Sequence, residues 1–335
     1  MRALVLEGVN KLVLRDMPKP VPTGEELLVK TVAATICTSD IIDILQDPFH
    51  MQMPRIMGHE GAGIVEAVGE LVTDFKPGDE IAAHPIVPCR VCHTCRSGFG
   101  HLCDNMTHLG IHIPGVYAEY FTIRQDRARR KPPQLPFSQA ALLEPVAVCL
   151  EAIKQGAVEP GQTVLVVGDG PFGVITARLC AAIAGVKVIF AGHHDVRMAG
   201  APGAIPVNTR QTEDPVSAIR ALTGGIGADC AILCVGSNAA VDLAIASLRT
   251  RGTLSVFSLV HGRPTIDLCR IHLKELTVRG SCSDHNRMDE SIALLGTGVM
   301  NGIVSHEFPL EAFEAAFDTA INNKAEAFKV ALLPC

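Results

Sequence analysis

Residues 163–175 read Thr-Val-Leu-Val-Val-Gly-Asp-Gly-Pro-Phe-Gly-Val-Ile, and this stretch decides the fold of the sequence around it. A short apolar run, typical of a buried strand, leads directly into the spacing G-x-G-x-x-G and then into an apolar helix. This order predicts a dinucleotide-binding loop, in which the glycines allow a tight turn, close approach to a pyrophosphate and close helix packing. The residues expected in this loop are Gly168, Gly170, Pro171, Phe172 and Gly173.

The sequence on the C-terminal side of this loop alternates between strand and helix patterns. Strands are predicted at 186–191, 229–234 and 253–259, with a helix at 239–249 between the last two. This alternation predicts an α/β domain with a doubly wound parallel sheet.

The end of the second predicted strand bears on the type of dinucleotide. A fold that prefers NAD usually places Asp or Glu there, to bind the ribose 2′-hydroxyl. This chain has Gly192-His193-His194-Asp195-Val196-Arg197 instead. Gly192 followed by His193 and Arg197 favours NADP, because these cations can accept a 2′-phosphate. NAD stays open, since Asp195 could serve the hydroxyl.

The N-terminal part has a different character. Short β-type runs at 2–6, 11–15 and 26–32 are separated by glycine, proline and asparagine. Further on, His59 and Glu60 stand between glycines within the sequence Met-Gly-His-Glu-Gly-Ala-Gly, and both side chains can bind a metal.

Cys37 and Ser39 precede this pair in the sequence Ile-Cys-Thr-Ser-Asp. Cys37 is a candidate thiolate ligand of a metal, and Ser39 is a candidate hydroxyl for proton transfer. The simpler interpretation is a buried free cysteine before a short helix capped by Ser39.

Four cysteines follow with the spacing C-x2-C-x2-C-x7-C. Four thiolates so close together fit a closed tetrahedral zinc site that stabilises a loop, and an iron–sulfur cluster is the alternative. The remaining cysteines have no ligand-like spacing, so we interpret them as packing residues. The cluster consists of Cys89, Cys92, Cys95 and Cys103; the packing group is Cys149, Cys180, Cys230, Cys234, Cys269, Cys282 and Cys335.

A helical segment between the two regions runs from Ser138, a candidate N-cap, to Gly156. Glu144-Pro145 indicates a restart of the helix, with proline at a first helical position. Glu144 would then lie at a helix start, either directed inward or simply favoured there by the helix dipole.

Composition excludes several classes of function. The chain has 335 residues, a net charge of −6 and no tryptophan, which gives no electrostatic or stacking case for nucleic acid or an anionic membrane. The one basic run, 127–131, is interpreted as a solvated loop edge. No bilayer-length apolar stretch or signal peptide is evident, so we expect a cytoplasmic protein with free thiols.

Taken together, these motifs resemble the zinc-dependent medium-chain dehydrogenases, in the branch of the polyol (sorbitol, galactitol-phosphate) and threonine dehydrogenases. The resemblance spans almost the whole chain. It rests on Cys37-Thr38-Ser39-Asp40, on Gly58-His59-Glu60 with Gly63 and Gly69, on the four clustered cysteines, on Glu144-Pro145 and on the glycine loop.

The resemblance implies a GroES-like catalytic domain (residues 1–148 and 281–335) interrupted by a Rossmann domain (residues 149–280). It implies two zinc ions per chain and a homodimer or homotetramer. Cys37 and His59 would bind the catalytic zinc, with Glu60 or Glu144 completing the shell. Hydride would pass between a secondary alcohol or polyol, or a hydroxy amino acid, and NAD(P), with Ser39 relaying a proton and the carboxylate that does not bind zinc assisting.

Three departures from the family pattern bear on the substrate and the cofactor. The position that often holds a relay histidine is Ile42, and no arginine follows Gly280 where sorbitol dehydrogenases use one. The segment 198–207 is short for a Rossmann helix.

Two alternative functions are also considered, because one fold can carry different activities: a zinc-free NADPH reductase of the quinone-reductase type, and a non-catalytic cofactor-binding protein.

Overall fold

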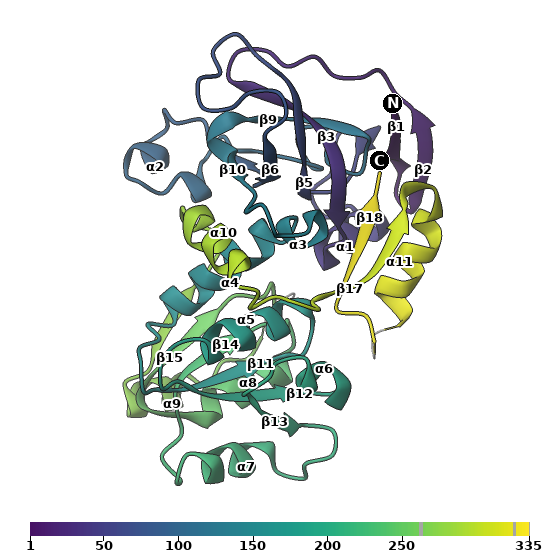
Figure 1. Cartoon of the computed structure of the whole chain (residues 1–335). Coiled ribbons are helices and arrows are strands. Elements are labelled where there is room, and N and C mark those ends of the chain that lie inside the picture. The colour runs from purple at the N-terminus through teal and green to yellow at the C-terminus, as the bar shows by residue number, and fades with distance from the viewer. Residues whose placement is uncertain (261–263, 324–325, 335) are drawn as a thin grey trace. The chain divides into compact units, whose positions relative to one another are not determined.

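The computed structural model describes residues 1–335 except 261–263, 324–325 and 335 (Figure 1). The chain forms two compact units, the first from Met1–Ala147 and His285–Cys335 and the second from Val148–Asp284. Helix α4 (Leu143–Gln155) begins in the first unit and ends in the second.

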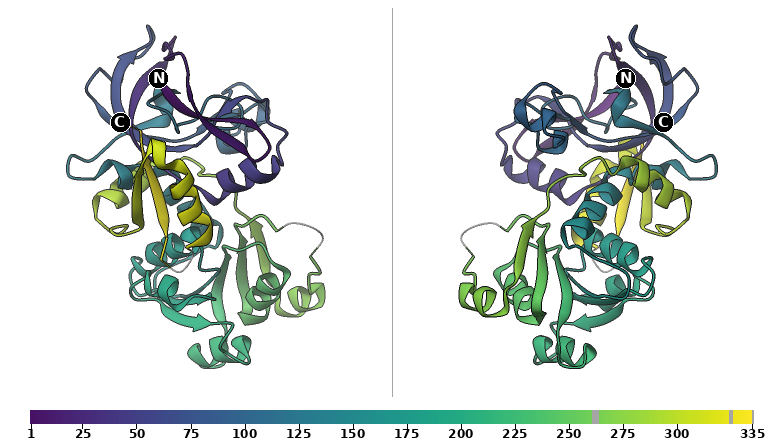
Figure 2. Two further views of the ribbon diagram at one scale, coloured as in Figure 1. Left: turned by 90° about the vertical axis from the view of Figure 1, so that its right-hand side faces the viewer. Right: turned by 90° about the vertical axis from the view of Figure 1, so that its left-hand side faces the viewer.

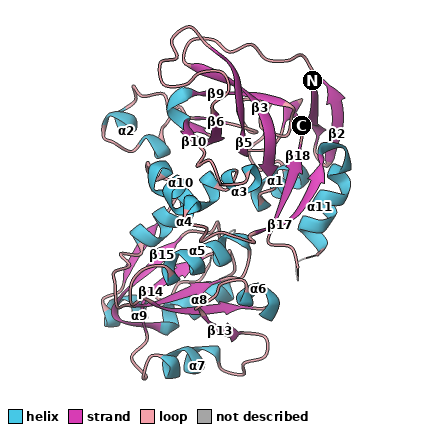
Figure 3. Ribbon diagram, viewed as in Figure 1, coloured by secondary structure: helices cyan, strands magenta, loops and turns pink. Residues whose placement is uncertain are grey.

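The first unit is built mainly of strands (Figure 3). Its strands are β1 (Arg2–Gly8), β2 (Lys11–Asp16), β3 (Glu26–Thr35), β4 (Arg55–Ile56), β5 (Glu60–Val68), β6 (Glu80–Ala83), β7 (Ile86–Val87), β8 (Thr107–His108), β9 (Tyr120–Arg124), β10 (Ala128–Arg130), β17 (Val304–Pro309) and β18 (Lys329–Leu333). Its helices are α1 (Thr38–Gln46), α2 (His93–Arg96), α3 (Phe137–Ala140), α10 (Met288–Gly296) and α11 (Phe313–Asn322), with 3₁₀ turns η1 (Gly100–Leu102), η2 (Gln125–Arg127) and η3 (Leu310–Ala312).

Strand β3 is the centre of this unit. It pairs with β5, β9 and β18, all antiparallel, in a sheet of order β10-β6-β5-β3-β18-β17. Seven of its ten residues are fully buried, which explains its nearly continuous apolar sequence. Strand β18, from the end of the chain, thus lies beside a strand from its beginning, as the yellow and purple segments in Figure 2 show.

The second unit is a parallel sheet of order β13-β12-β11-β14-β15-β16 with helices between the strands. Its strands are β11 (Thr163–Val167), β12 (Lys187–Gly192), β13 (Ile205–Asn208), β14 (Ala228–Leu233), β15 (Leu248–Val256) and β16 (Thr277–Gly280); its helices are α5 (Pro171–Ala181), α6 (Asp195–Ala199), α7 (Pro215–Leu222), α8 (Asn238–Ser247) and α9 (Leu268–Lys274). The predicted doubly wound α/β fold is confirmed. Helix α6 has only five residues, as the broken sequence after it suggested.

One prediction about the surface is wrong. The basic run 127–131 is not a solvated loop edge, because Arg127 and Lys131 are buried around strand β10. Arg127 contacts the Nδ1 atom of His84 at 2.8 Å, and Lys131 lies 2.8 Å from a carboxylate oxygen of Glu80. Polar partners inside the protein therefore replace water for these cations.

Some smaller predictions also need correction. Cys269 and Cys282 are exposed, so they are not packing residues, whereas Cys149, Cys180 and Cys230 are buried and Cys234 is half-buried. Cys335 lies outside the described residues. Ser138 is not an N-cap, because α3 begins after Pro136 and contains Ser138. Likewise α1 begins after Cys37, so Ser39 lies inside that helix and does not cap it.

Within the described part of the chain, none of the helices has both the length and the apolar character needed to cross a bilayer.

Candidate active site and metal centres

Cys37 lies where strand β3 gives way to helix α1, and the first turn of that helix fixes its position. Cys37 is the N-cap residue, and its backbone N–H donates to Oδ2 of Asp40 at 3.1 Å. This is one half of a capping box, in which the third helical residue reaches back to the cap. The thiol is held at a helix N-terminus with an exposed fraction of 3%.

Asp40 also fixes the orientation of His59. Its Oδ1 lies 2.9 Å from Nδ1 of His59, and its Oδ2 accepts a hydrogen bond of 2.6 Å from the Tyr117 hydroxyl. Burial alone would raise the pKa of Asp40, but the charge and hydrogen bond of His59 lower it, together with the hydrogen bonds from the Tyr117 hydroxyl and the Cys37 backbone. Because Asp40 occupies Nδ1, the Nε2 atom of His59 is the one available to a metal.

The glycine before His59 has no room for a side chain. Gly58 has φ of +91°, and a Cβ atom there would lie 2.4 Å from the Tyr117 ring. The same backbone is paired on its other edge, since Val116 N–H donates to the Gly58 carbonyl at 3.0 Å. The left-handed turn at Gly58 therefore sets the direction in which His59 leaves the chain.

Glu60 is paired with a lysine that the sequence analysis did not identify. Lys329 on β18 donates to both carboxylate oxygens of Glu60, at 2.5 and 2.6 Å, and Thr35 donates to one of them. Both charged side chains are at most 1% exposed. Burial would lower the pKa of Lys329, but the charge of Glu60 raises it.

These contacts bring three candidate ligand atoms together. One donor atom each of Cys37, His59 and Glu60 lies within 4.8 Å of the others. A thiolate, an imidazole and a carboxylate at this spacing fit a zinc ion with an open coordination position. Glu144 is buried in the first turn of α4, outside this group, and its charge acts on Lys329. Ser39 lies two residues after Cys37 and is exposed.

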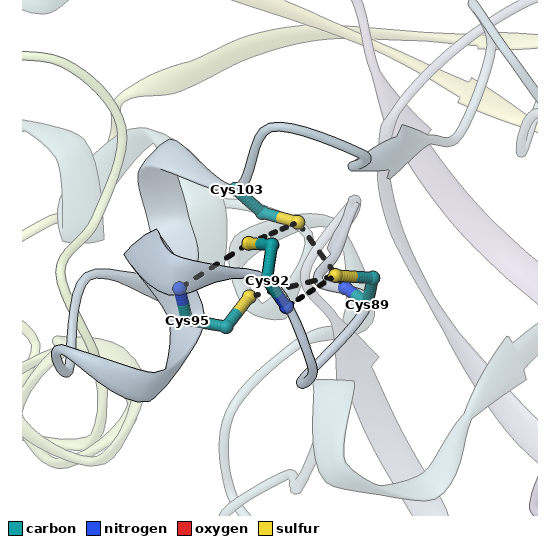
Figure 4. A group of neighbouring side chains, drawn as sticks. All are labelled: Cys89, Cys92, Cys95 and Cys103. Carbon is teal, nitrogen blue, oxygen red and sulfur yellow. Dashed lines mark hydrogen bonds between the residues drawn. The ribbon is translucent and has the colours of Figure 1, made fainter.

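The four clustered cysteines form a second group of donors, in the lobe 88–106 (Figure 4). The sulfur of Cys89 lies 4.0 Å from that of Cys95, and the sulfur of Cys92 lies 3.8 Å from that of Cys103. These separations exclude disulfides and fit thiolates around one metal ion. Backbone N–H groups of Val91 and Cys92 lower the pKa of the Cys89 thiol to about 6.

The base of this lobe is closed by a two-stranded ladder that brings His108 beside His59. Strands β7 and β8 pair through Ile86 with His108 and Val87 with Thr107. The ring centroids of His108 and His59 are 5.3 Å apart in an edge-to-face arrangement. Nδ1 of His108 lies 2.6 Å from the Leu109 carbonyl, and burial with the nearby His59 lowers the pKa of His108 to about 3.

The second unit carries the predicted glycine loop between β11 and α5. Gly168 has φ of +109°, and a Cβ atom on Gly173 would lie 1.7 Å from the Gly168 carbonyl oxygen. A Cβ atom on Gly170, the N-cap of α5, would project into open space. Open space at the start of a helix fits the approach of a pyrophosphate to that backbone.

Asp169, between the first two glycines, holds the end of strand β12. Its Oδ2 accepts hydrogen bonds from the backbone N–H groups of His193 and His194, at 2.8 and 2.6 Å, and lies 2.9 Å from His194 Nδ1. A Cβ atom on Gly192 would lie 2.6 Å from the Asp169 side chain. The carboxylate missing from the end of β12 is thus supplied from the glycine loop.

Some of the predicted cofactor-binding residues line a cavity, and others do not. A cavity of about 730 Å³ is lined by Gly168, Asp169, Gly192, His193 and Arg270, among others. Its volume is in the range of small-molecule sites. Arg197 is buried, and its burial lowers its pKa. Asp195, in the first turn of α6, accepts a 2.7 Å hydrogen bond from Asn208 at the end of β13.

Comparison with known proteins matches both units. Residues 23–133 match the alcohol dehydrogenase GroES-like domain, and residues 171–297 match the zinc-binding dehydrogenase domain. L-threonine 3-dehydrogenase of Bacillus subtilis is 30% identical over 100% of this chain and 99% of its own length. The chain belongs to the zinc-binding alcohol dehydrogenase family. Sorbitol dehydrogenase of the same organism is 29% identical to this dehydrogenase, over 100% of this chain and 97% of its own.

Solved structures agree with this assignment. A zinc-binding dehydrogenase from Sinorhizobium meliloti, crystallised with NADP, superposes on our dehydrogenase with a TM-score of 0.92 at 26% identity, covering 99% of each chain. The predicted GroES-like catalytic domain and Rossmann domain are confirmed, as is the identification of the chain as an oxidoreductase.

The structure adds residues to the dehydrogenase site that the sequence analysis missed. Asp40 and Tyr117 orient His59, Lys329 neutralises Glu60, and Asp169 holds the end of β12. A signal for Lys329 existed, because it is a lone cation at the start of an otherwise apolar strand. Asp40 was visible as the third residue after the helix cap.

Proposed function

We propose that this dehydrogenase uses zinc to move hydride between a secondary alcohol, a polyol or a hydroxy amino acid and a nicotinamide cofactor. The observation that carries the proposal is the meeting of Cys37, His59 and Glu60 donor atoms within 4.8 Å. A zinc-free reductase is not favoured, because such an enzyme has no use for this buried set of ligands.

Cys37, His59 and one carboxylate would hold the catalytic zinc. Glu60 is supported as that carboxylate because it lies within the cluster of donor atoms. Because Glu60 is already bound to Lys329 by two hydrogen bonds, Glu144 stays the alternative ligand. The four lobe cysteines would hold a second zinc with no open position. Bound zinc supplies Lewis acidity that lowers the pKa of an alcohol hydroxyl.

The residues of the chain would guide the proton and the cofactor. Asp40 keeps His59 in the tautomer with Nδ1 protonated. Ser39, exposed in the first turn of α1, would take the hydroxyl proton of the alcohol and pass it to solvent. The carboxylate of Glu60 or Glu144 that does not bind the metal would assist through water.

NADP is our proposed cofactor, with NAD as the alternative. Support comes from the absence of an acid at position 192 and from the exposed His193 beside the cavity. The charge of Asp169 is compensated by N–H donors from His193 and His194. Gly168, Gly170, Pro171, Phe172 and Gly173 would hold the pyrophosphate, and Arg197, a buried residue of α6, would add positive charge for the 2′-phosphate.

The test combines elemental analysis with turnover. Zinc content is measured on the purified protein and on Glu144→Ala, together with oxidation of a panel of small polyols and L-threonine using NAD and NADP. Two zinc ions per chain with turnover support the proposal, and loss of one zinc in the variant assigns Glu144 as a ligand. One zinc, with cofactor binding but no oxidation, would overturn it.

We also propose a homodimer or homotetramer that works in the cytoplasm. Strand β16 is the edge of its sheet and all four of its residues are exposed, which leaves an edge for pairing with a second copy. The described cysteines are all free, as expected in a reducing compartment. Light scattering of the zinc-loaded protein measures the oligomeric state, and a monomer would contradict the first part.

A further inference from the structure

The chain passes between its two units at two places of different character. The first passage lies within helix α4, between Ala147 and Val148, and the second lies between Asp284 and His285. A helix supplies hydrogen bonds to its own backbone, whereas residues 283–286, here called the return crossing, belong to no helix or strand. The conformation of the return crossing therefore depends on contacts of its residues with other segments.

The backbone of the return crossing is strained. Ser283, His285 and Asn286 have φ of +60°, +38° and +63°, so three of its four residues are in the left-handed region. Residues other than glycine seldom adopt this conformation, and it persists only where the surrounding structure holds it. The crossing should therefore relax when the contacts that hold it are lost.

One such contact comes from the cysteine lobe (residues 88–106), which belongs to the same unit as His285. The His285 ring is stacked on the His101 ring, with centroids 4.5 Å apart and planes inclined by 15°. The Phe99 ring lies against both, with its centroid 5.4 Å from that of His285 and 6.2 Å from that of His101. His101 is buried, so the ring on which His285 lies is itself held in place by its surroundings.

The two lobe rings are in turn positioned by the segments that carry the clustered cysteines. His101 lies in the turn η1, which ends at Cys103, and the Cys103 N–H donates to the Gly100 carbonyl at 3.1 Å. Phe99, just before this turn, donates its N–H to the Thr94 carbonyl of α2 at 3.0 Å. Both short elements contain or adjoin a cysteine of the cluster, so a metal ion bound by the four sulfur atoms would fix their positions.

We propose that the cysteine lobe is a metal-dependent latch on the return crossing. With zinc bound by the four cysteines, Phe99 and His101 are held in place, and their contact with the His285 ring keeps residues 283–286 in the left-handed conformation. This inference rests on the zinc proposed above for the lobe, and it does not depend on the hydride transfer proposed for the other centre. The lobe metal thereby controls the order of a segment that links the two units.

Hydrogen–deuterium exchange of the backbone amides of residues 282–287 tests the latch. In the zinc-loaded wild type these amides should be protected. Cys103→Ser, which removes a metal ligand, and His285→Ala, which removes the stacked ring, should each make them exchange roughly tenfold faster. The double variant should exchange no faster than either single variant, because both changes release the same contact.

A conservative variant and two controls separate the latch from general loss of stability. His285→Phe keeps a flat ring for the stack and should retain most of the protection. Cys269→Ser replaces an exposed cysteine outside the lobe, and His306→Ala removes a ring stacked on Phe308 in β17. Neither control should change the exchange of residues 282–287, and the amides of β3 should exchange as in the wild type in every variant.

Zinc content and alcohol oxidation are measured on the same samples. If Cys103→Ser loses zinc but residues 282–287 keep their wild-type exchange, or if His285→Ala has no effect, the latch is overturned. Equal zinc content in Cys103→Ser and the wild type would overturn it as well. If exchange responds as expected but no alcohol is oxidised with NAD or NADP, the proposed function fails and the latch stands.

Discussion

At the scale of single residues, Asp43 in helix α1 is a carboxyl group with an exposed fraction of only 2%. Its burial, followed by the nearby charges of Asp40 and Asp47, raises its pKa to about 7, and His59 acts in the opposite direction. The ordinary pKa of an aspartate is 3.8. The folded protein therefore holds a proton on Asp43 over a pH range in which the unfolded chain does not.

Asp43→Asn should stabilise the protein in a pH-dependent way. As pH rises from about 4 to 7, the folded wild type must either keep the extra proton or bury a charge, so its unfolding free energy falls. The amide does not titrate, so the advantage of the variant should be absent near pH 4, grow towards pH 7 and then level off. Urea unfolding at several pH values measures it, with the exposed Asp16→Asn as control. An advantage independent of pH would contradict the assignment.

At the scale of elements, the cysteine lobe is the segment of chain that joins strand β7 to strand β8. The lobe 88–106 contains only short helices, α2 and η1, and its four sulfur atoms face one another (Figure 4). Such a segment has little apolar core of its own, so a bound metal would provide most of its stability.

Cys103→Ser should therefore remove one zinc per chain and loosen the lobe. Elemental analysis should show the loss, and limited proteolysis should cut the variant within residues 88–106 at least tenfold faster than the wild type. Cys269→Ser is the matched control, because that cysteine is exposed and far from the cluster in sequence. Equal zinc content in the two variants would show that the lobe binds no metal.

Two glycines of the loop between β11 and α5, Gly173 and Gly170, should respond differently to substitution by alanine. Gly173→Ala would place a methyl group 1.7 Å from the Gly168 carbonyl oxygen, so it should destabilise the second unit, by roughly 1–3 kcal/mol as for an overpacked core. Gly170→Ala meets nothing within 4 Å, so it should leave stability unchanged but weaken NADP binding. Thermal unfolding and fluorescence titration with NADPH measure the two effects. Unfolding temperatures that fall equally in both variants would contradict this reading.

At the scale of the whole chain, the Glu60–Lys329 pair joins the beginning to the end. Strand β18 adds to β3 and places Lys329 against Glu60, 269 residues away in sequence. Both groups are fully buried, so each depends on the other for charge compensation.

Lys329→Met should lower the unfolding free energy by about 3–5 kcal/mol, because it leaves the Glu60 carboxylate buried without its cation. Adding Glu60→Gln should recover much of this loss, since the double variant buries no charge. Urea unfolding of the single and double variants measures the coupling. Additive losses would show that the pair contributes nothing beyond its separate side chains.

The features that local sequence predicted are those encoded within a few adjacent residues. The glycine loop, the four spaced cysteines and the Gly58-His59-Glu60 segment each carry their own spacing. Lys329, the burial of Arg127 and the contact of His108 with His59 depend on segments distant in sequence meeting in space. No local pattern reports a partner that lies dozens or hundreds of residues away, so these could not be predicted.

The distance in sequence between Glu60 and Lys329 also sets an order of events during synthesis. At about 5–20 residues per second, a ribosome needs roughly 15–50 s to travel from one to the other. Throughout that interval the nascent chain already holds Cys37, His59 and Glu60, yet it lacks the cation that neutralises Glu60. The candidate metal site is thus complete only when the last strand docks, and an incomplete chain carries the metal donors without the cation that neutralises Glu60.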